Sequence, residues 1–215
     1  MEIKAILPEN LGWLESKLDE SILKRVRQAI KKASIDHGKS LAGNISSSLV
    51  LEDKDNWFFK EVIVPHIKTF EKAFPAYTHK DVYGAKMTQS HSIAVMDQWW
   101  VNFQKQYEFN PVHNHGGIFS FVIWLEIPTH YKDQHKLPIS GGSNHPSASN
   151  FEFHFVNNLG YRTHHIYKLS PASEGTMLFF PARLEHCVYP FYNCKKNRVS
   201  VAGNIYLDSL RPGNS

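Results

Sequence analysis

The chain has 215 residues, of which 42% are hydrophobic and 20% are charged, as is ordinary for a globular protein with its own core. The formal net charge of +4 is modest and forms no basic stripe, so a nucleic-acid partner is not expected. No signal-peptide pattern and no window near the roughly 18 apolar residues of a membrane span is present, so we expect a cytoplasmic protein without a membrane partner. In that compartment Cys187 and Cys194 should be reduced.

The N-terminal third has helical patterning. Residues 8–37 predict a short helix that begins at Pro8 and a second helix over Ser21–Ala33, where apolar residues recur every three or four positions. Asp55–Phe74 predict a further amphipathic helix, kinked or frayed at Pro65. The apolar face of this last helix could also serve a homodimer.

From about residue 84 the apolar period changes from 3.6 to 2. Residues 90–109 predict two strands with a turn near Met96–Gln98, and residues 117–128 predict a strand buried on both faces. Residues 129–149 predict a long polar loop, and five short strands follow over residues 151–207.

The expected fold is therefore mainly β with N-terminal helices: a double-stranded β-helix, or cupin-like jelly roll, packed against helices. We expect one compact domain, in which residues 1–83 form a helical region that packs on the sheet and residues 84–215 form the double-stranded β-helix core.

Three of the thirteen histidines have a context that suggests chemistry. His113 and His115 are one residue apart, and on a strand such side chains point to the same face. His186 follows a strand that ends at Pro181, so the three imidazoles predict a metal site. Two loop histidines that bind backbone groups are the simpler alternative for His113 and His115.

Six other histidines lie in polar loops or on helical faces and are not expected to be ligands: His37, His66, His79, His130, His135 and His145.

Arg198 stands twelve residues after His186, and Ser200 lies two residues further on the same strand face. A guanidinium presents two parallel donors, which suits a carboxylate better than an ammonium does. The apolar neighbours of Arg198 would make an unpaired cation costly, so a partner anion is expected.

Four spaced motifs resemble a known family, and they read W-x-N, H-x-H, FP-x(4)-H-x-V-x-P and R-x-S-x-x-x-N. In this chain they are Trp100–Asn102, His113–His115, Phe180–Pro190 and Arg198–Asn204. They resemble the 2-oxoglutarate/Fe(II)-dependent oxygenases, specifically the branch well represented in marine bacteriophages, over about residues 40–207.

The resemblance implies a 2-oxoglutarate- and Fe(II)-dependent dioxygenase, a hydroxylase of an unknown substrate, with 2-oxoglutarate and dioxygen as co-substrates. It would act in the host cytoplasm if the chain is viral. It implies Fe(II) bound by the three histidines His113, His115 and His186. Arg198 and Ser200 would bind the far carboxylate of 2-oxoglutarate, and Asn102 would donate to the bound keto acid.

One departure leaves the ligand set open, because the first motif of the superfamily is usually His-x-Asp or His-x-Glu. Either all three histidines bind as in some cupin-type dioxygenases, or His115 replaces the carboxylate and 2-oxoglutarate chemistry is kept, or Asp97 or Glu126 completes the set. Because zinc also suits three histidines, a cupin-like three-histidine dioxygenase or a zinc hydrolase that uses no 2-oxoglutarate is one alternative function. A non-enzymatic jelly-roll binding or structural protein is the other.

Overall fold

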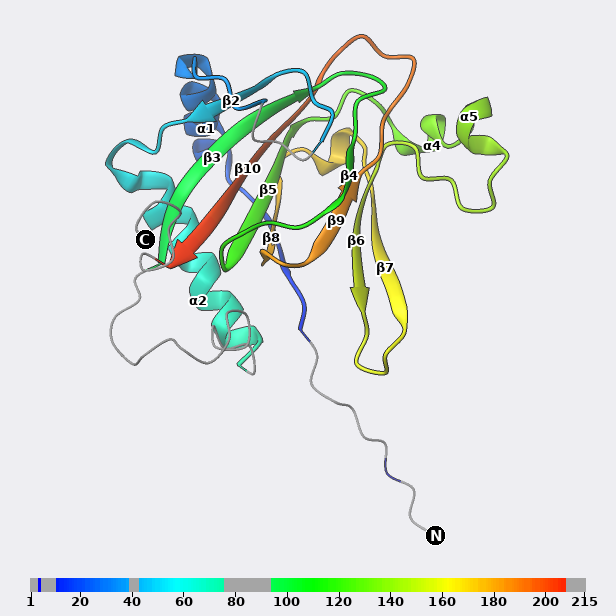
Figure 1. Ribbon diagram of the computed structural model, residues 1–215. Coiled ribbons are helices and arrows are strands. Elements are labelled where there is room, and N and C mark those ends of the chain that lie inside the picture. The colour runs from blue at the N-terminus through cyan, green and yellow to red at the C-terminus, as the bar shows by residue number, and fades with distance from the viewer. Residues whose placement is uncertain (1–3, 5–10, 39–42, 76–93, 208–215) are drawn as a thin grey trace.

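The computed structural model describes residues 4, 11–38, 43–75 and 94–207. Within them, two antiparallel sheets face each other (Figure 1). The larger, which we call the major sheet, contains in spatial order β1 (Leu14–Lys17), β8 (Thr176–Pro181), β5 (Phe119–Glu126), β10 (Arg198–Leu207), β3 (Ala94–Gln104) and β2 (Ser48–Leu51). The minor sheet contains β4 (Asn110–His113), β9 (Glu185–Val188), β6 (Asn150–Val156) and β7 (Arg162–Lys168). The expected double-stranded β-helix packed against helices is confirmed.

Two helices, α1 (Glu20–Lys32) and α2 (Val64–Ala73), lie on the side of the major sheet away from the minor sheet (Figure 1). Both helices were predicted. A 3₁₀ turn (Lys54–Asn56) and a π-helical turn (Phe59–Ile63) precede α2, so the helical irregularity that was expected at Pro65 falls just before this residue. Short helical turns, α4 (Tyr131–Gln134) and α5 (Pro138–Gly141), interrupt the predicted 129–149 loop, and a 3₁₀ turn (Pro171–Ser173) precedes β8.

The apolar residues form two layers of core, one on each face of the major sheet. Under the helices Phe58 stacks on Trp99, with ring centroids 4.6 Å apart, and Phe70 meets Phe119 edge to face at 5.0 Å. Between the sheets the core includes Phe153 and other buried aromatic residues.

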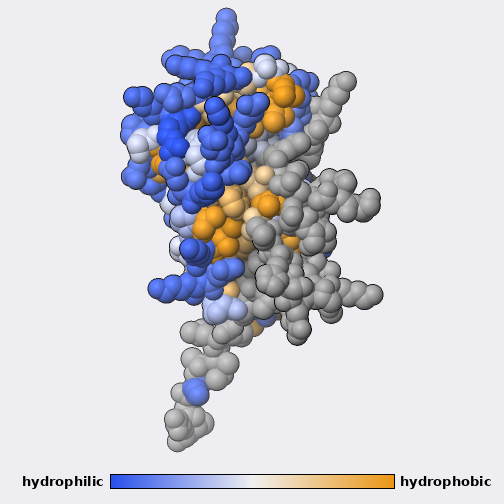
Figure 2. Space-filling view, turned by 90° about the vertical axis from the view of Figure 1, so that its left-hand side faces the viewer, coloured by the Kyte–Doolittle hydropathy of each residue, from blue (hydrophilic) through white to orange (hydrophobic). Residues whose placement is uncertain are grey.

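The apolar face of residues 55–74, which could have served a homodimer, is thus buried inside the chain. The basic face of α1 is turned to solvent, and hydrophilic residues cover the upper part of the surface in Figure 2, where α1 lies.

Two local predictions were wrong. Leu14–Lys17 form strand β1, at the edge of the major sheet, instead of continuing a helix from Pro8, because they pair with β8. Residues 5–10 lie outside the described chain. The expected turn near Met96–Gln98 is a register irregularity within one continuous β3, opposite Asn204 and Ile205 of β10. The first 83 residues therefore add strands β1 and β2 to the sheet as well as helices. In the ranges described, no helix is long and apolar enough to cross a membrane.

The packing of α2 on the major sheet can be tested at Phe70, whose side chain is fully buried. We expect Phe70→Ala to lower the free energy of unfolding by about 3–5 kcal/mol, because it removes apolar contacts and leaves a cavity. The exposed Lys72, on the same helix, provides the control Lys72→Ala, for which we expect a change within about 0.5 kcal/mol. Urea unfolding measures both, and equal midpoints for the two variants would contradict this packing.

Candidate active site

Three histidines converge between the two sheets. Pairing of β4 with β9 places His113 directly opposite His186. His115 lies beyond the end of β4, where its N–H donates to the carbonyl of Ala182 at 2.8 Å. The expectation that His113 and His115 share a face of one strand is therefore wrong, yet their rings still meet, with centroids 5.0 Å apart. One ring nitrogen from each of the three histidines lies within 4.8 Å of the others.

Backbone carbonyls orient two of these rings. Nδ1 of His113 lies 2.7 Å from the carbonyl oxygen of Pro111, and Nδ1 of His186 lies 3.0 Å from that of Leu184. Because a carbonyl only accepts, each Nδ1 carries the proton and each Nε2 presents a lone pair, as in histidines that bind metals. Nε2 of His115 is 3.2 Å from Nε2 of His186. Two nitrogens bound to one metal at about 2.1 Å lie about 3.0–3.4 Å apart in octahedral or tetrahedral geometry.

The environment keeps the three imidazoles neutral. Burial lowers the pKa of His115 to about 4, with a further contribution from His113. Burial also lowers the pKa of His186 well below 6.5, helped by the charges that His113 and His115 would carry, and it lowers the pKa of His113. Neutral imidazole is the form that binds a metal, so protons do not compete for the site at neutral pH.

The histidines open onto a cavity of about 340 Å³ between the sheets. Asn102 and Ser200, both predicted to bind the keto acid, line this cavity and are register partners on β3 and β10. Three buried polar atoms of the lining, Nε1 of Trp100, Oδ1 of Asn102 and Oδ1 of Asn110, have no hydrogen-bond partner in the described part of the chain. Buried polar groups are rarely left unpaired, so the cavity suits a polar ligand.

Arg198 is 1% exposed and lies two residues from Ser200 along β10, but its side chain does not line the cavity. Its guanidinium donates to Oγ and O of Ser149 at 2.6 and 3.3 Å, to Oε1 of Gln104 at 3.3 Å and to the carbonyl of Tyr189 at 3.4 Å. All these acceptors are neutral, and within the described residues its Nε has no partner. Burial lowers its pKa to about 9, so it remains a cation at neutral pH without a carboxylate beside it in the ranges described.

One wall of the cavity was not predicted from the sequence. His37, expected to be an ordinary loop residue, is buried and stacks on Trp100 with ring centroids 4.7 Å apart. Among the described residues no carboxylate joins the three histidines. Glu126 is exposed at the end of β5, and the side chain of Asp97 lies outside the described part of the chain.

Two facing sheets around a histidine-lined cavity define a double-stranded β-helix protein. A family model described as "Putative 2OG-Fe(II) oxygenase" matches residues 98–204, a range that contains the three histidines and Arg198. The chain belongs to this family of 2OG-Fe(II) oxygenases and is an enzyme of the oxidoreductase class. The family thus favours an oxygenase over a zinc hydrolase or a non-enzymatic jelly roll.

Two solved structures with TM-scores above 0.5 agree with this fold. The chain is similar to the non-heme alpha ketoglutarate dependent carbocyclase SnoK of nogalamycin biosynthesis, with 10% identity, a TM-score of 0.51 and coverage of 93% of this chain and 80% of that one. It is similar to the epimerase SnoN of the same biosynthesis, with 11% identity, a TM-score of 0.51 and coverage of 92% and 77%. A 2OG-Fe(II) oxygenase family oxidoreductase from Burkholderia pseudomallei shows 14% identity and a TM-score of 0.47, with coverage of 87% and 79%. A comparison with curated proteins finds no match.

The buried histidines predict a pH dependence of stability in the metal-free protein. The pKa of His115 is 6.5 when unfolded and about 4 when folded, so as the pH falls from 6.5 toward 4 the unfolded state takes up the proton first and stability is lost. This difference in the pKa of His115 corresponds to a loss of about 3 kcal/mol in the free energy of unfolding. We expect His115→Gln, which cannot titrate, to lose less stability than wild type between pH 7 and pH 4.5 in urea unfolding. An identical loss in both proteins would contradict the burial of a neutral His115.

Proposed function

We propose that this oxygenase hydroxylates its substrate at an Fe(II) ion bound by His113, His115 and His186, with 2-oxoglutarate and dioxygen as co-substrates. The observation that carries the proposal is the convergence of three neutral imidazoles whose ligand atoms lie within 4.8 Å of one another. When bound, Fe(II) and 2-oxoglutarate supply the oxidising chemistry, in which dioxygen is consumed, 2-oxoglutarate is converted to succinate and CO₂, and one oxygen atom enters the substrate.

The donor set fits Fe(II). Three protein ligands on one side of the ion leave positions for the co-substrates, as in the facial sites of non-haem oxygenases. The separation of 3.2 Å between Nε2 of His115 and Nε2 of His186 suits two ligands of one ion. The backbone carbonyls of Pro111 and Leu184 fix the rings of His113 and His186, so the protein orients the ligands before any metal binds.

The surroundings of Arg198 fit the far carboxylate of 2-oxoglutarate. A buried guanidinium bonded only to neutral acceptors lacks the anion that would offset its desolvation. Ser200 lines the cavity two residues away, and its register partner Asn102 would donate to the same ligand through Nδ2. Ser200 and Asn102 would bind the keto acid from the cavity wall, and Arg198 would reach its far carboxylate by turning its guanidinium from Ser149 toward the cavity. The apolar walls of the cavity, among them Phe151 and Phe180, would limit the access of water.

The metal ligands can be tested by anaerobic titration of the metal-free protein with Fe(II). We expect His186→Ala to weaken Fe(II) binding by about 100-fold or more, since loss of a ligand should exceed the 10- to 100-fold effect of losing a residue that only orients a ligand. His130→Ala, which removes a histidine outside the cavity, should bind as wild type does. Equal Fe(II) affinity in the two variants would exclude His186 as a ligand.

The carboxylate partner can be tested by adding 2-oxoglutarate to the Fe(II)-loaded protein and following the visible metal-to-ligand charge-transfer band. Arg198→Lys keeps the charge but loses the two parallel donors, so we expect the Kd of 2-oxoglutarate to rise about 10- to 100-fold while Fe(II) still binds. The exposed Arg162 provides the control Arg162→Lys. An unchanged Kd in Arg198→Lys would assign Arg198 to structure alone, and a protein that binds Fe(II) but never gives the band would favour chemistry without 2-oxoglutarate.

A further inference from the structure

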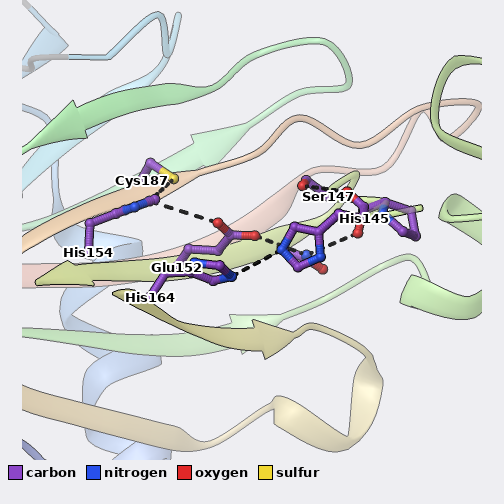
Figure 3. Close-up of polar contacts among 8 residues, drawn as sticks. His145, Ser147, Glu152, His154, His164 and Cys187 are labelled. Carbon is purple, nitrogen blue, oxygen red and sulfur yellow. Dashed lines mark hydrogen bonds and ion pairs between the residues drawn. The ribbon is translucent and has the colours of Figure 1, made fainter. Parts of the chain in front are cut away.

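A second cluster of potential metal ligands lies on the opposite face of the minor sheet. Side chains alternate along a strand, so Phe153 and His186 face the interior while Glu152 and His154 of β6 and Cys187 of β9 face outward. The register pairs Glu152 with Cys187, so a carboxyl group and a thiol meet across two adjacent strands (Figure 3).

The distances within this cluster suit a bound ion. The ligand atoms of Glu152, His154 and Cys187 all lie within 4.8 Å of one another. Nε2 of His154 is 3.4 Å from Sγ of Cys187 and 3.8 Å from Oε2 of Glu152. Tetrahedral zinc with bonds of about 2.0–2.3 Å would place such atoms about 3.4–3.6 Å apart, so small side-chain movements would complete the set.

Burial makes a cation at this position favourable. Glu152 is 3% exposed and Cys187 is 5% exposed, although the outer face of a two-sheet protein is usually solvated. The Glu152 carboxyl receives a hydrogen bond from Nδ2 of Asn150 at 3.3 Å, and in the ranges described no lysine or arginine pairs with it. Its only ion-pair partner among the described residues is the imidazole of His154 at 3.8 Å, which is a cation only when protonated. A buried carboxylate beside a neutral imidazole is costly, and a bound metal ion would remove that cost.

Two more imidazoles border the cluster. His164 of β7 is the register partner of His154, with ring centroids 6.2 Å apart, and its Nε2 is 3.0 Å from Nε2 of His145 (Figure 3). Both side chains are exposed and therefore free to change rotamer. His164 is thus the nearest candidate for a fourth ligand, with water as the alternative.

We propose that Glu152, His154 and Cys187 form a second metal site, distinct from the three-histidine cavity, that binds Zn²⁺. A thiolate, an imidazole and a carboxylate are all zinc ligands, whereas Ca²⁺ and Mg²⁺ select oxygen donors. The thiol proton is released to solvent when the ion binds. The proposal is independent of the chemistry proposed for the cavity.

The position of the site indicates a structural role. Cys187 is the residue after His186, and β9 and β6 pair at Phe153 and His186 as well as at Glu152 and Cys187. An ion that joins Cys187 to Glu152 and His154 would fasten β9 to β6 directly behind His186. Zinc would therefore stabilise the strand that carries a histidine of the cavity.

Co²⁺ is the probe for this site, because a cobalt–thiolate bond gives an intense near-ultraviolet charge-transfer band that three histidines cannot produce. We expect the full-length protein to show the band on cobalt titration, Cys187→Ser to lose it, and Cys194→Ser, which removes the other free cysteine, to keep it. His113→Ala, altered only in the cavity, should also keep it. Absence of the band in wild type, or its persistence in Cys187→Ser, would overturn the proposal.

Zinc stabilisation gives a second readout. At about 100 times its Kd, Zn²⁺ should raise the Tm of His113→Ala by about 5–10 °C, because it binds the folded state. Should Cys187→Ser fail to fold, His154→Gln replaces it, since the His154 side chain is 27% exposed and its loss disturbs packing less. We expect His154→Gln to weaken zinc binding at least about tenfold in the His113→Ala background. An unchanged zinc affinity there would also overturn the proposal.

Discussion

The antiparallel pairing of β4 with β9 is the contact on which the site depends. It places His113 opposite His186 at the edge of the minor sheet, with ring centroids 4.3 Å apart. The other edge of β9 pairs with β6, whose Phe151 stacks on the ring of His186 at 5.6 Å. His115 reaches the same point from beyond the end of β4, held by a single backbone hydrogen bond to Ala182. Cross-strand register therefore brings His113 and His186 together, although they are 73 residues apart in the sequence.

Successive side chains of β9 point to opposite faces of the minor sheet, so this short strand places residues in two different chemical environments. His186 faces the cavity, where its burial keeps the imidazole neutral, and Cys187 faces the buried carboxyl group of Glu152 on the outer side of the same sheet. A metal on either face would restrict the same strand. The positions of the outer cluster (Glu152, His154 and Cys187) and of the cavity residue His186 therefore both depend on the pairing of β9 with β6.

Much of the architecture could be predicted from periodicity. The change from period 3.6 to period 2 separated α1 and α2 from the strands, and the strands from β5 to β10 were predicted close to their observed ranges. Leu14–Lys17 were mistaken for helix because their pairing with β8, whose residues lie 159 to 165 positions away in sequence, overrides local propensity. The bulge in β3 resembled a turn because one irregular residue interrupts alternation as a turn does.

The site was predictable only where its residues share short motifs. His113, His115 and His186 stand in spaced motifs and do converge, and Asn102 and Ser200 do line their cavity. His37 reaches that cavity by stacking on Trp100, a contact that leaves no local pattern in the sequence. The outer cluster of Glu152, His154 and Cys187 depends on the pairing register of β6 with β9, and register could not be deduced before the strands were placed.

Iron K-edge X-ray absorption spectroscopy on the anaerobic protein loaded with one equivalent of Fe(II) would show directly whether three histidines bind the iron. We expect nitrogen and oxygen scatterers alone in the nearest shell and the multiple-scattering pattern of three imidazoles, from His113, His115 and His186. A pattern of fewer imidazoles would contradict the three-histidine site, and a sulfur scatterer would place the iron at Cys187, on the wrong face of the sheet.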